Sequence, residues 1–238
     1  MDGYSLRREN FLVSAMPPNR AASKETMACI RRKLGTAPHQ VAPIGLKELQ
    51  AMIAALPHSS KGIRDRALLL LGFAGALRRS ELVALDVTDG TPSDYGLVVM
   101  LRRSKTDQEG EGRTVGIPYG SHLETCPVRA VQMWLQTSEI TEGPIFRPVD
   151  QHGVIGLTRL SDRLVARIIQ SSAKRAGLDP EQFAGHSLRA GLATAAAAAG
   201  VSEHDIARTT GHRSVAVLRR YVRAATVFER NAAASVGL

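Results

Sequence analysis

The amino-acid sequence predicts a mainly α-helical protein of the α+β class, with one small antiparallel β-sheet. Over most of residues 44–238, apolar residues recur three and four positions apart, which is the spacing of a helix with one buried face. Between residues 86 and 118 the pattern changes to short β-leaning runs separated by turn residues, which is typical of strands. The 238 residues are 44% hydrophobic and 22% charged, a balance that favours a packed domain over a disordered chain.

The N-terminal part, residues 1–43, differs from the rest. It contains one predicted helix, residues 23–34, which Ser23 can cap and Gly35 can end. The stretch TAPHQVAPI that follows contains two prolines, which favour extended backbone, so we expect a linker there. We therefore divide the chain into residues 1–43 and a second domain of residues 44–238.

The second domain holds the expected core. The run ALLLLGF, residues 67–73, is the most apolar and predicts a central buried helix. A small sheet interrupts the helices, and the polar stretches DGTPSD and SKTDQEGEG connect its strands. The expected helices span residues 46–56, 62–77, 127–136, 161–176, 187–199, a short segment from 202, 214–223 and 227–238, and the expected strands span residues 86–88, 95–102 and 113–118.

Positive charge is in excess along the chain. Lys and Arg together number 31 against 22 acidic residues, a formal net charge of +9, and 25 of the 31 are Arg. Such a basic protein is expected to bind a polyanion, with nucleic acid as the first candidate. The planar fork of Arg can bind two phosphate oxygens at once. A genome of high GC content produces the same excess of Arg, so composition alone leaves that explanation open.

Cysteine usage and hydropathy bear on location. Cys29 and Cys126 are too few for a disulfide framework and are not spaced as a metal site, so we expect no metal and a cytoplasmic protein. The longest apolar run, residues 67–77, is well short of the roughly 20 residues that span a bilayer. The N-terminus, MDGYSLRRENF, lacks the apolar stretch of a secretory signal. We expect neither a membrane span nor export.

Two segments carry side chains suited to binding a phosphate. In GHSLRAG, His186 and Arg189 share the first turn of a predicted helix, beside free backbone amides. In GALRRSEL, Arg78 or Arg79 follows the most apolar helix, and Glu81 stands three positions after Arg78, where a carboxylate can orient it. Each pattern has an ordinary structural alternative: a capping histidine with a surface arginine, or a surface ion pair.

Two further segments carry groups suited to proton transfer and nucleophilic attack. Lys105 lies in SKTDQEGEG at the turn of the predicted hairpin, where an ammonium group can donate a proton or neutralise an oxyanion, although a solvated turn lysine is the alternative. In TGHRSVAVLRRYVR, His212 precedes Tyr221, and arginines flank the tyrosine. A tyrosine among cations is suited to act as a covalent nucleophile.

Placed in chain order, these residues form a series that resembles the catalytic domain of the tyrosine recombinases, the phage integrase and Xer family. The resemblance covers about residues 44–238 and implies a helical catalytic domain with a small antiparallel sheet. The ordered combination is much more specific than any single motif. The matching positions are Arg78, Lys105, His186, Arg189, His212 and Tyr221.

The resemblance implies how a phosphate would be held. Arg78 and Arg189 match the two arginines that clamp the scissile phosphate, and Lys105 matches the lysine that protonates the leaving 5′ oxygen. His186 matches a general acid or base. His212 matches the position, His or Trp in the family, that hydrogen-bonds the phosphate. No cofactor is implied, since fixed cations can stabilise the transferring phosphoryl group in place of a metal.

The resemblance also implies the reaction. Tyr221 matches the nucleophile that forms a 3′-phosphotyrosyl link, so we expect a site-specific recombinase or integrase that cleaves and rejoins double-stranded DNA. Two alternatives stay open. A type IB topoisomerase would relax supercoils with nearly the same residues, and a truncated remnant would bind DNA without recombining it. The compact length and the GHSLRAG context favour a recombinase over the topoisomerase.

The two ends of the chain depart from or extend the family pattern. Members usually carry a helical core-binding domain ahead of the catalytic part, and residues 1–43 resemble only its last helix and linker, so we expect a fragment, a truncated gene or a naturally short member with weaker DNA binding. At the other end, the family implies that a final helix docks onto a neighbouring protomer in a tetramer on DNA. Residues 227–238 fit that helix. We expect a nucleoid-associated protein of bacterial or phage origin.

Overall fold

The computed structural model describes residue 26, residues 41–102 and 112–212, and residues 216, 218, 219, 221 and 222. Its contacts divide the chain into Met1–Gln40 and Val41–Leu238, and everything below concerns the second unit. The predicted helix over residues 23–34 lies outside the described residues except for Thr26. The same is true of the final helix predicted over residues 227–238.

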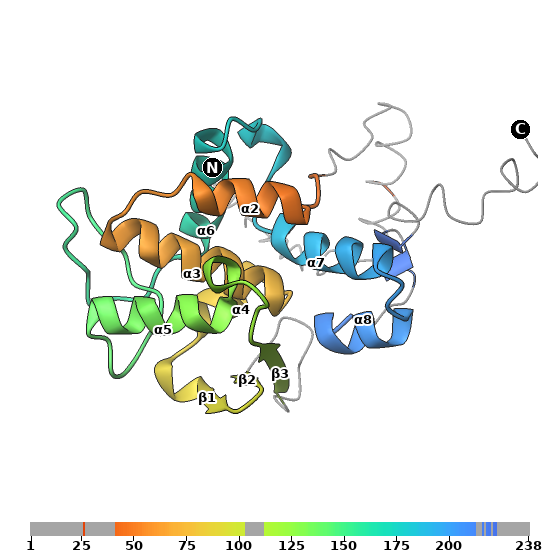
Figure 1. Cartoon of the computed structure of the whole chain (residues 1–238), viewed down its shortest axis with the longest axis horizontal. Helices are drawn as coiled ribbons and strands as arrows, with labels where there is room; N and C mark the ends of the chain where they lie inside the picture. Colours follow the sequence, from red (N-terminus) through yellow and green to blue (C-terminus); the bar gives the residue numbers. More distant parts are fainter. Residues whose placement is uncertain are drawn as a thin grey trace, which may run out of the picture. The chain divides into compact units, whose positions relative to one another are not determined.

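The second unit is mainly helical, as predicted, and α3 lies at its centre (Figure 1). This helix packs against four others, α2, α4, α5 and α7. The six predicted helices that the structure describes in full are present, with ends shifted by at most three residues. They are α2 (Leu46–Ala54), α3 (Ser60–Ala74), α5 (Pro127–Ser138), α6 (Asp162–Arg175), α7 (Ser187–Ala198) and α8 (Glu203–Thr210).

The ends of α3 follow from local sequence. Ser59 caps the helix, because its hydroxyl accepts a hydrogen bond of 3.3 Å from the backbone N–H of Gly62. The run of leucines within α3 is almost entirely buried. The helix ends three residues before the predicted position, because Ala76 adopts a left-handed backbone with φ 46° and cannot continue it. This turn brings Arg78 out of the core.

A short helix that the sequence reasoning did not predict follows this turn. It is α4 (Arg79–Ala84), and Arg78 occupies its N-cap position. The carboxylate of Glu81 accepts a hydrogen bond of 2.9 Å from the backbone N–H of Arg78, which satisfies one of the free amides at the helix start. The segment is too short for a helical periodicity to stand out in the sequence.

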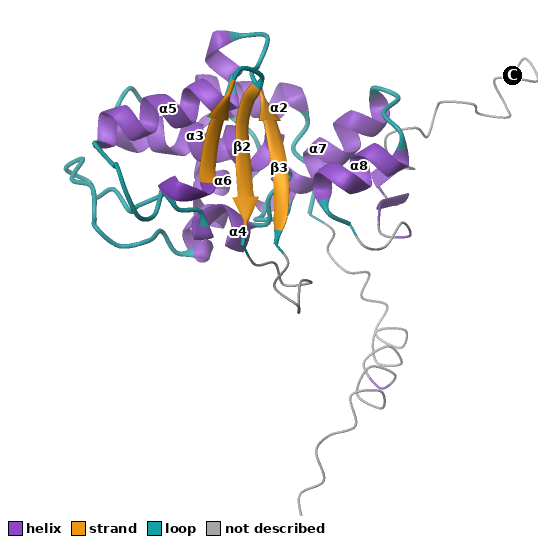
Figure 2. Cartoon of the chain, turned by 90° about the horizontal axis from the view of Figure 1, so that it is seen from below, coloured by secondary structure: helices purple, strands orange, loops and turns teal. Residues whose placement is uncertain are grey.

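The sheet has three antiparallel strands in the order β1 (Gly90–Ser93), β2 (Gly96–Leu101) and β3 (Arg113–Pro118). Figure 2 shows the strands side by side, and a hydrogen bond from Arg113 to the carbonyl of Thr209 links β3 to α8. Val99 pairs with Val115, and both are buried. Alternate residues of β2 and β3 therefore face the core, which is the pattern of a sheet covered on one side.

The first predicted strand, residues 86–88, is wrong. Those residues enter a short 3-10 helix, Val87–Asp89, because the carboxylate of Asp89 accepts a hydrogen bond of 2.9 Å from the backbone N–H of Asp86 and closes the turn. The first strand is instead β1, which lies in DGTPSD, a stretch that the sequence predicts as a connection. Pro92 is tolerated there because β1 is an edge strand.

A second, smaller core joins α7, α8 and the segment that carries Tyr221. It consists of the buried residues Ala193, Ala197, Ile206 and Leu218, with Tyr221 and Val222 packed against them. The residues described at 216–222 are helical, in agreement with the helix predicted over residues 214–223. Alanine side chains on α7 let the neighbouring segments approach closely, and this packing positions Tyr221.

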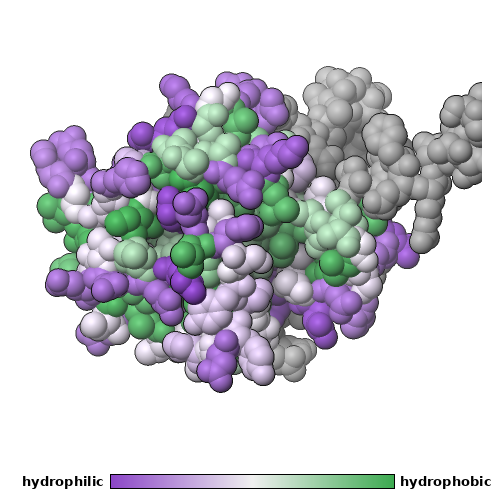
Figure 3. All heavy atoms as spheres, in the orientation of Figure 1, coloured by the Kyte–Doolittle hydropathy of each residue, from purple (hydrophilic) through white to green (hydrophobic). Residues whose placement is uncertain are grey.

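The surface seen in Figure 3 mixes hydrophilic and hydrophobic residues. The described exposed hydrophobic residues come from many elements, such as Leu46 at the start of α2 and Met133 in α5. No helix within the described part of the chain has both the length and the apolar character needed to cross a bilayer.

Candidate active site

Arg78 is held at the start of α4 by a buried carboxylate. Glu81 is only 3% exposed and forms an ion pair with the guanidinium of Arg78. The same carboxylate also bonds the backbone N–H of Arg78, so side chain and backbone are fixed together. Because the guanidinium side chain keeps some exposure, 18%, it can meet a ligand from one side.

Arg79 lies in a different environment. Its side chain is 44% exposed and pairs with Asp162 at 3.1 Å, at the start of α6. Of the two adjacent arginines considered from the sequence, Arg78 is the one joined to the buried cluster described below. This difference becomes visible only once the turn after α3 is known.

Arg189 lies inside α7 and is 6% exposed, so the alternative of a surface arginine is wrong. Its Nη1 donates a hydrogen bond of 2.8 Å to the backbone carbonyl of Ala76 in the turn after α3. Its Nη2 is also buried and has no hydrogen-bond partner within the described residues. A buried donor of this kind is suited to an anionic ligand.

Burial and neighbouring cations act on the charge of Arg189. Burial, followed by repulsion from Arg78, lowers the pKa of Arg189 to about 10. At neutral pH the guanidinium therefore keeps its proton and its positive charge. Glu81 and Tyr221 oppose the shift, and Arg113 adds to it, which shows that all these side chains lie within electrostatic reach of Arg189.

His212 and Tyr221 lie next to each other. Their ring centroids are 6.1 Å apart. His212 follows directly after Gly211, which ends α8 with a left-handed backbone (φ 65°). Burial, followed by repulsion from Arg189, Arg78 and Arg113 in that order, lowers the pKa of His212 to about 4. The imidazole is therefore neutral at neutral pH.

Arg113 belongs to this cluster and was not among the residues singled out from the sequence. It is the first residue of β3, and its Nη1 donates a hydrogen bond of 2.6 Å to the carbonyl of Thr209. Its Nη2 lies 3.7 Å from Glu81. Its side chain is 20% exposed, and burial lowers its pKa. In the sequence, Arg113 follows a polar connection at the start of a predicted strand and alternates with Val115. Neither feature indicates a chemical role for Arg113.

The remaining two predicted residues are His186 and Lys105. His186 occupies the N-cap position of α7, one turn before Arg189, and its side chain is exposed. Lys105 lies outside the described residues, together with most of the connection between β2 and β3. The structure thus brings together Arg78, Glu81, Arg189, His212 and Tyr221, and adds Arg113.

The charge balance of this cluster is positive. Three guanidinium groups, from Arg78, Arg113 and Arg189, lie around the single carboxylate of Glu81, and the neutral imidazole of His212 adds no negative charge. The arrangement can bind an anion with two negative oxygens and place it beside a tyrosine hydroxyl. Within the part of the chain that the structure describes, no group of acidic, histidine or cysteine side chains is arranged to hold a metal ion.

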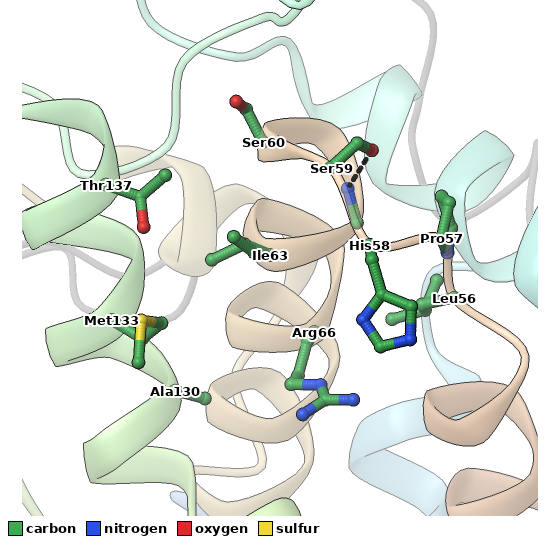
Figure 4. Close-up of a pocket in the computed structure, with 11 residues that line it drawn as sticks. Leu56, Pro57, His58, Ser59, Ser60, Ile63, Arg66, Ala130, Met133 and Thr137 are labelled. Carbon is green, nitrogen blue, oxygen red and sulfur yellow. Dashed lines mark hydrogen bonds between the residues drawn. The ribbon is translucent and has the colours of Figure 1, made fainter.

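One pocket of the described part of the chain lies away from this cluster. Figure 4 shows a cavity of about 340 Å³ between the start of α3 and α5, lined by His58, Ser59, Arg66 and Met133 among others. None of the candidate site residues lines it. The cationic cluster is instead partly buried, since Arg189 is 6% exposed and the side chains of Arg78 and Arg113 are 18% and 20% exposed.

The comparison with known families decides the relationship. The sequence model of the phage integrase family matches residues 44–227. This chain belongs to the phage integrase family. An integrase/recombinase XerD homologue from Selenomonas ruminantium is 43% identical over 88% of this chain, and the match covers 62% of that relative. The tyrosine recombinase XerC 1 of Ralstonia nicotianae is 29% identical, covering 75% of this chain and 55% of the relative.

Solved structures of the family share the fold. One is the post-cleavage complex of the XerH site-specific recombinase bound to a palindromic difH substrate. Its TM-score is 0.61 and its sequence identity is 19%, and the match covers 79% of this chain and 50% of that chain. The XerA recombinase has a TM-score of 0.60 and 21% identity, covering 82% and 66%. The predicted fold class and family resemblance are confirmed. This integrase-family chain spans about three fifths of the length of the two curated relatives named above.

Proposed function

We propose that this chain is the catalytic part of a site-specific recombinase that cleaves and rejoins double-stranded DNA through Tyr221. One observation carries the proposal: Arg78, Arg189, His212 and Tyr221 come from different segments and meet in one cluster with an excess of positive charge. The order of these residues along the chain matches the family pattern, which adds weight to the assignment.

The two arginines would hold the scissile phosphate. Among the described residues, the buried Nη2 of Arg189 has no hydrogen-bond partner, and Arg78 is paired with Glu81 while its side chain stays 18% exposed. Two guanidinium groups fixed in this way can bind the non-bridging oxygens and stabilise the charge that builds up during phosphoryl transfer. Because these groups are ordered before DNA arrives, little reorganisation is needed in the transition state.

Tyr221 would supply the nucleophile. Its hydroxyl oxygen attacks the phosphorus, the bond from phosphorus to the 5′ oxygen breaks, and the 5′ oxygen leaves with a proton. By the family pattern, Lys105 donates that proton and His186 handles the proton of the tyrosine hydroxyl. The phosphotyrosyl link keeps the phosphodiester bond energy, so a 5′ hydroxyl from another strand can attack it and release Tyr221 without a cofactor.

The partners follow from the same pattern. We infer that the substrate is double-stranded DNA, because the solved neighbours include recombinases bound to DNA. We also infer, from the family pattern, that protomers assemble on paired sites through residues 227–238. The apolar residues of that segment favour a docking helix. They are Val227, Phe228, Ala232, Ala233 and Val236. We expect the protein to act in the cytoplasm, at the nucleoid.

Covalent trapping on DNA tests the proposal. Pooled DNA fragments from the source, carrying nicks that let the cleaved strand diffuse away, are incubated with the wild-type chain and with Tyr221→Phe. The wild type should give a covalent adduct that maps to Tyr221, and the variant should give none while DNA binding stays nearly unchanged. Sequencing the trapped DNA identifies the site.

The alternatives have separate outcomes. Measurable, salt-sensitive DNA binding without an adduct would identify a remnant that binds but does not recombine. An adduct spread over many sequences, with relaxation of supercoiled DNA, would identify a topoisomerase. Either result contradicts the recombinase proposal.

A further inference from the structure

His212 is held by the residue two positions before it. Its Nδ1 lies 2.6 Å from the hydroxyl oxygen of Thr210, the last residue of α8. Thr210 is fully buried, with an exposed fraction of 0%. The distance and the burial make this a strong hydrogen bond in which the direction of donation matters.

The direction follows from counting protons. The Thr210 hydroxyl oxygen also lies 2.7 Å from the backbone carbonyl oxygen of Ile206. A carbonyl oxygen can only accept, so the single hydroxyl proton must lie between these two oxygens. Thr210 then has no proton left for His212. Nδ1 of the imidazole must donate, which means that the neutral ring carries its proton on Nδ1 and leaves Nε2 bare.

The backbone around this pair is fixed from two sides. Gly211 closes α8 with a hydrogen bond of 2.7 Å from its N–H to the carbonyl of Ala207. From β3, Arg113 donates to the carbonyl of Thr209, and its guanidinium packs so closely on Gly211 that a Cβ there would lie 2.9 Å from the guanidinium carbon. The turn therefore cannot rotate His212 freely, and the Thr210 contact sets the orientation of the ring.

We propose that Thr210 is a positioning residue that fixes the Nδ1-protonated tautomer of His212 and so reserves Nε2 for the scissile phosphate. The assignment of Nε2 to the phosphate rests on the proposed function, whereas the tautomer rests only on the contacts above. Nothing in the family pattern that identified His212 specifies which of its ring nitrogens faces the DNA.

The assignment has a chemical consequence for DNA binding. A bare Nε2 accepts hydrogen bonds, and it must take up a proton before it can donate one to a phosphate oxygen. The cationic groups that face His212 are Arg189 on α7, Arg78 at the start of α4 and Arg113 on β3, and all three disfavour that proton. A bound phosphate offsets their charge, so binding of the scissile phosphate brings proton uptake at Nε2.

The tautomer can be measured on the full chain without DNA. Histidine labelled with ¹⁵N gives separate resonances for protonated and bare ring nitrogens, and the signals of His212 are assigned by their loss in His212→Asn. Three variants are compared with the wild type at neutral pH. Thr210→Val removes the hydroxyl and keeps the shape, Thr210→Ser keeps the hydroxyl, and Thr209→Val is the matched control on the neighbouring threonine.

We expect a protonated Nδ1 in the wild type, in Thr210→Ser and in Thr209→Val, and a mixture of both tautomers in Thr210→Val. Thermal unfolding of each variant checks that it folds. A wild-type ring protonated on Nε2, or an unchanged tautomer in a folded Thr210→Val, would overturn the proposal.

Cleavage of the nicked DNA provides the second measurement. Thr210→Val should lower the cleavage rate by about 10- to 100-fold, the range usual for groups that orient a histidine, with DNA binding unchanged and with recovery in Thr210→Ser. If the wild type forms no adduct yet shows the expected tautomer, the recombinase function fails and the Thr210 assignment stands. If Thr210→Val has an altered tautomer and still cleaves at a normal rate, Nε2 of His212 has no role in the cleavage reaction, which overturns its assignment to the phosphate.

Discussion

Glu81 is a buried carboxylate that serves two arginines at once. It forms an ion pair with Arg78 and lies 3.7 Å from Arg113. A buried ion pair contributes little net stability, because desolvation of the two charges offsets their attraction. Its value here is orientation, since the carboxylate determines which edge of Arg78 faces the ligand.

The assignment of Arg78 over its neighbour can be tested directly. Arg78→Ala should lower the rate of DNA cleavage by at least about 100-fold, because it removes charge-assisted hydrogen bonds made to the phosphate in the transition state. Arg79→Ala is the matched control and should cleave at a near-normal rate, because Arg79 pairs with Asp162 outside the cluster. Single-turnover cleavage of the nicked substrate measures both. An equal loss in the two variants would refute the assignment.

His212 should give the protein a specific sensitivity to acid. The pKa of His212 in the folded protein, about 4, lies below the ordinary value of 6.5, so the unfolded chain binds this proton more readily. The contribution of the neutral ring to stability is therefore complete above pH 6.5 and is lost as the pH falls from there towards 4.

Thermal unfolding over this pH range tests that expectation. The Tm of the wild type should fall relative to the Tm of His212→Asn as the pH decreases, since the variant has no imidazole to protonate. His204→Asn, a change at an exposed histidine of α8, is the control. A constant difference in Tm between wild type and His212→Asn would contradict the assigned pKa.

At the scale of elements, the site depends on a link between the sheet and α8. Arg113 makes this link, because it starts β3 and bonds the carbonyl of Thr209 in α8. The second hydrophobic core holds α8 and the Tyr221 segment against α7. The positions of Tyr221 and His212 thus depend on contacts between elements that are far apart along the chain.

Arg113→Met should uncouple these elements. We expect cleavage to fall by about 10- to 100-fold, since small displacements of reacting groups are costly, and the pKa of His212 to rise because a nearby cation is removed. Arg159→Met is the matched control. Arg159 also binds a carboxylate, that of Asp86 at 2.6 Å, and a backbone carbonyl, that of Val83 at 2.8 Å, but it does so away from the cluster.

Measured cleavage rates, unfolding temperatures and His212 titrations separate the two variants. If Arg113 had a purely structural role, Arg113→Met and Arg159→Met would lose stability to a similar degree. The cleavage rate per folded molecule and the titration of His212 would then stay unchanged in both. Arg113→Lys, which keeps the charge without the fork, should recover the titration more fully than the cleavage rate.

At the scale of the whole molecule, the described unit gathers the guanidinium groups of Arg78, Arg113 and Arg189 in one partly buried cluster. In the proposed function, DNA and other protomers complete this cluster. The chain's excess of Arg over Lys fits the binding of DNA, because Arg binds phosphate oxygens in pairs.

Removal of residues 227–238 tests the assembly. Deletion should abolish cooperative formation of complexes on paired DNA sites and leave cleavage of a single site intact, since the apolar side chains of the segment are expected to bind a neighbouring protomer. Gel-shift titration with one-site and two-site DNA measures the difference. Assembly that persists after deletion would exclude this segment as the docking element.

The elements that the sequence predicted well have strong local signals. Ser59, Pro127 and Ser202 mark helix starts, and the apolar runs of α3 and β2 mark buried elements. The first strand was misplaced because the Asp86–Asp89 hydrogen bond and the edge position of Pro92 are not visible in a local pattern. Helix α4 was missed because one and a half turns give no periodicity.

The sequence by itself determined the fold class, the family and the order of the candidate residues, because hydrophobic spacing and motif order are properties of the chain. Only the tertiary structure showed that Arg78 joins the buried cluster whereas Arg79 does not, that Arg113 joins it too, and that Nδ1 of His212 lies against Thr210. Those properties depend on distances between segments far apart in the chain and on burial, which sets the charge of each group and the direction of each hydrogen bond.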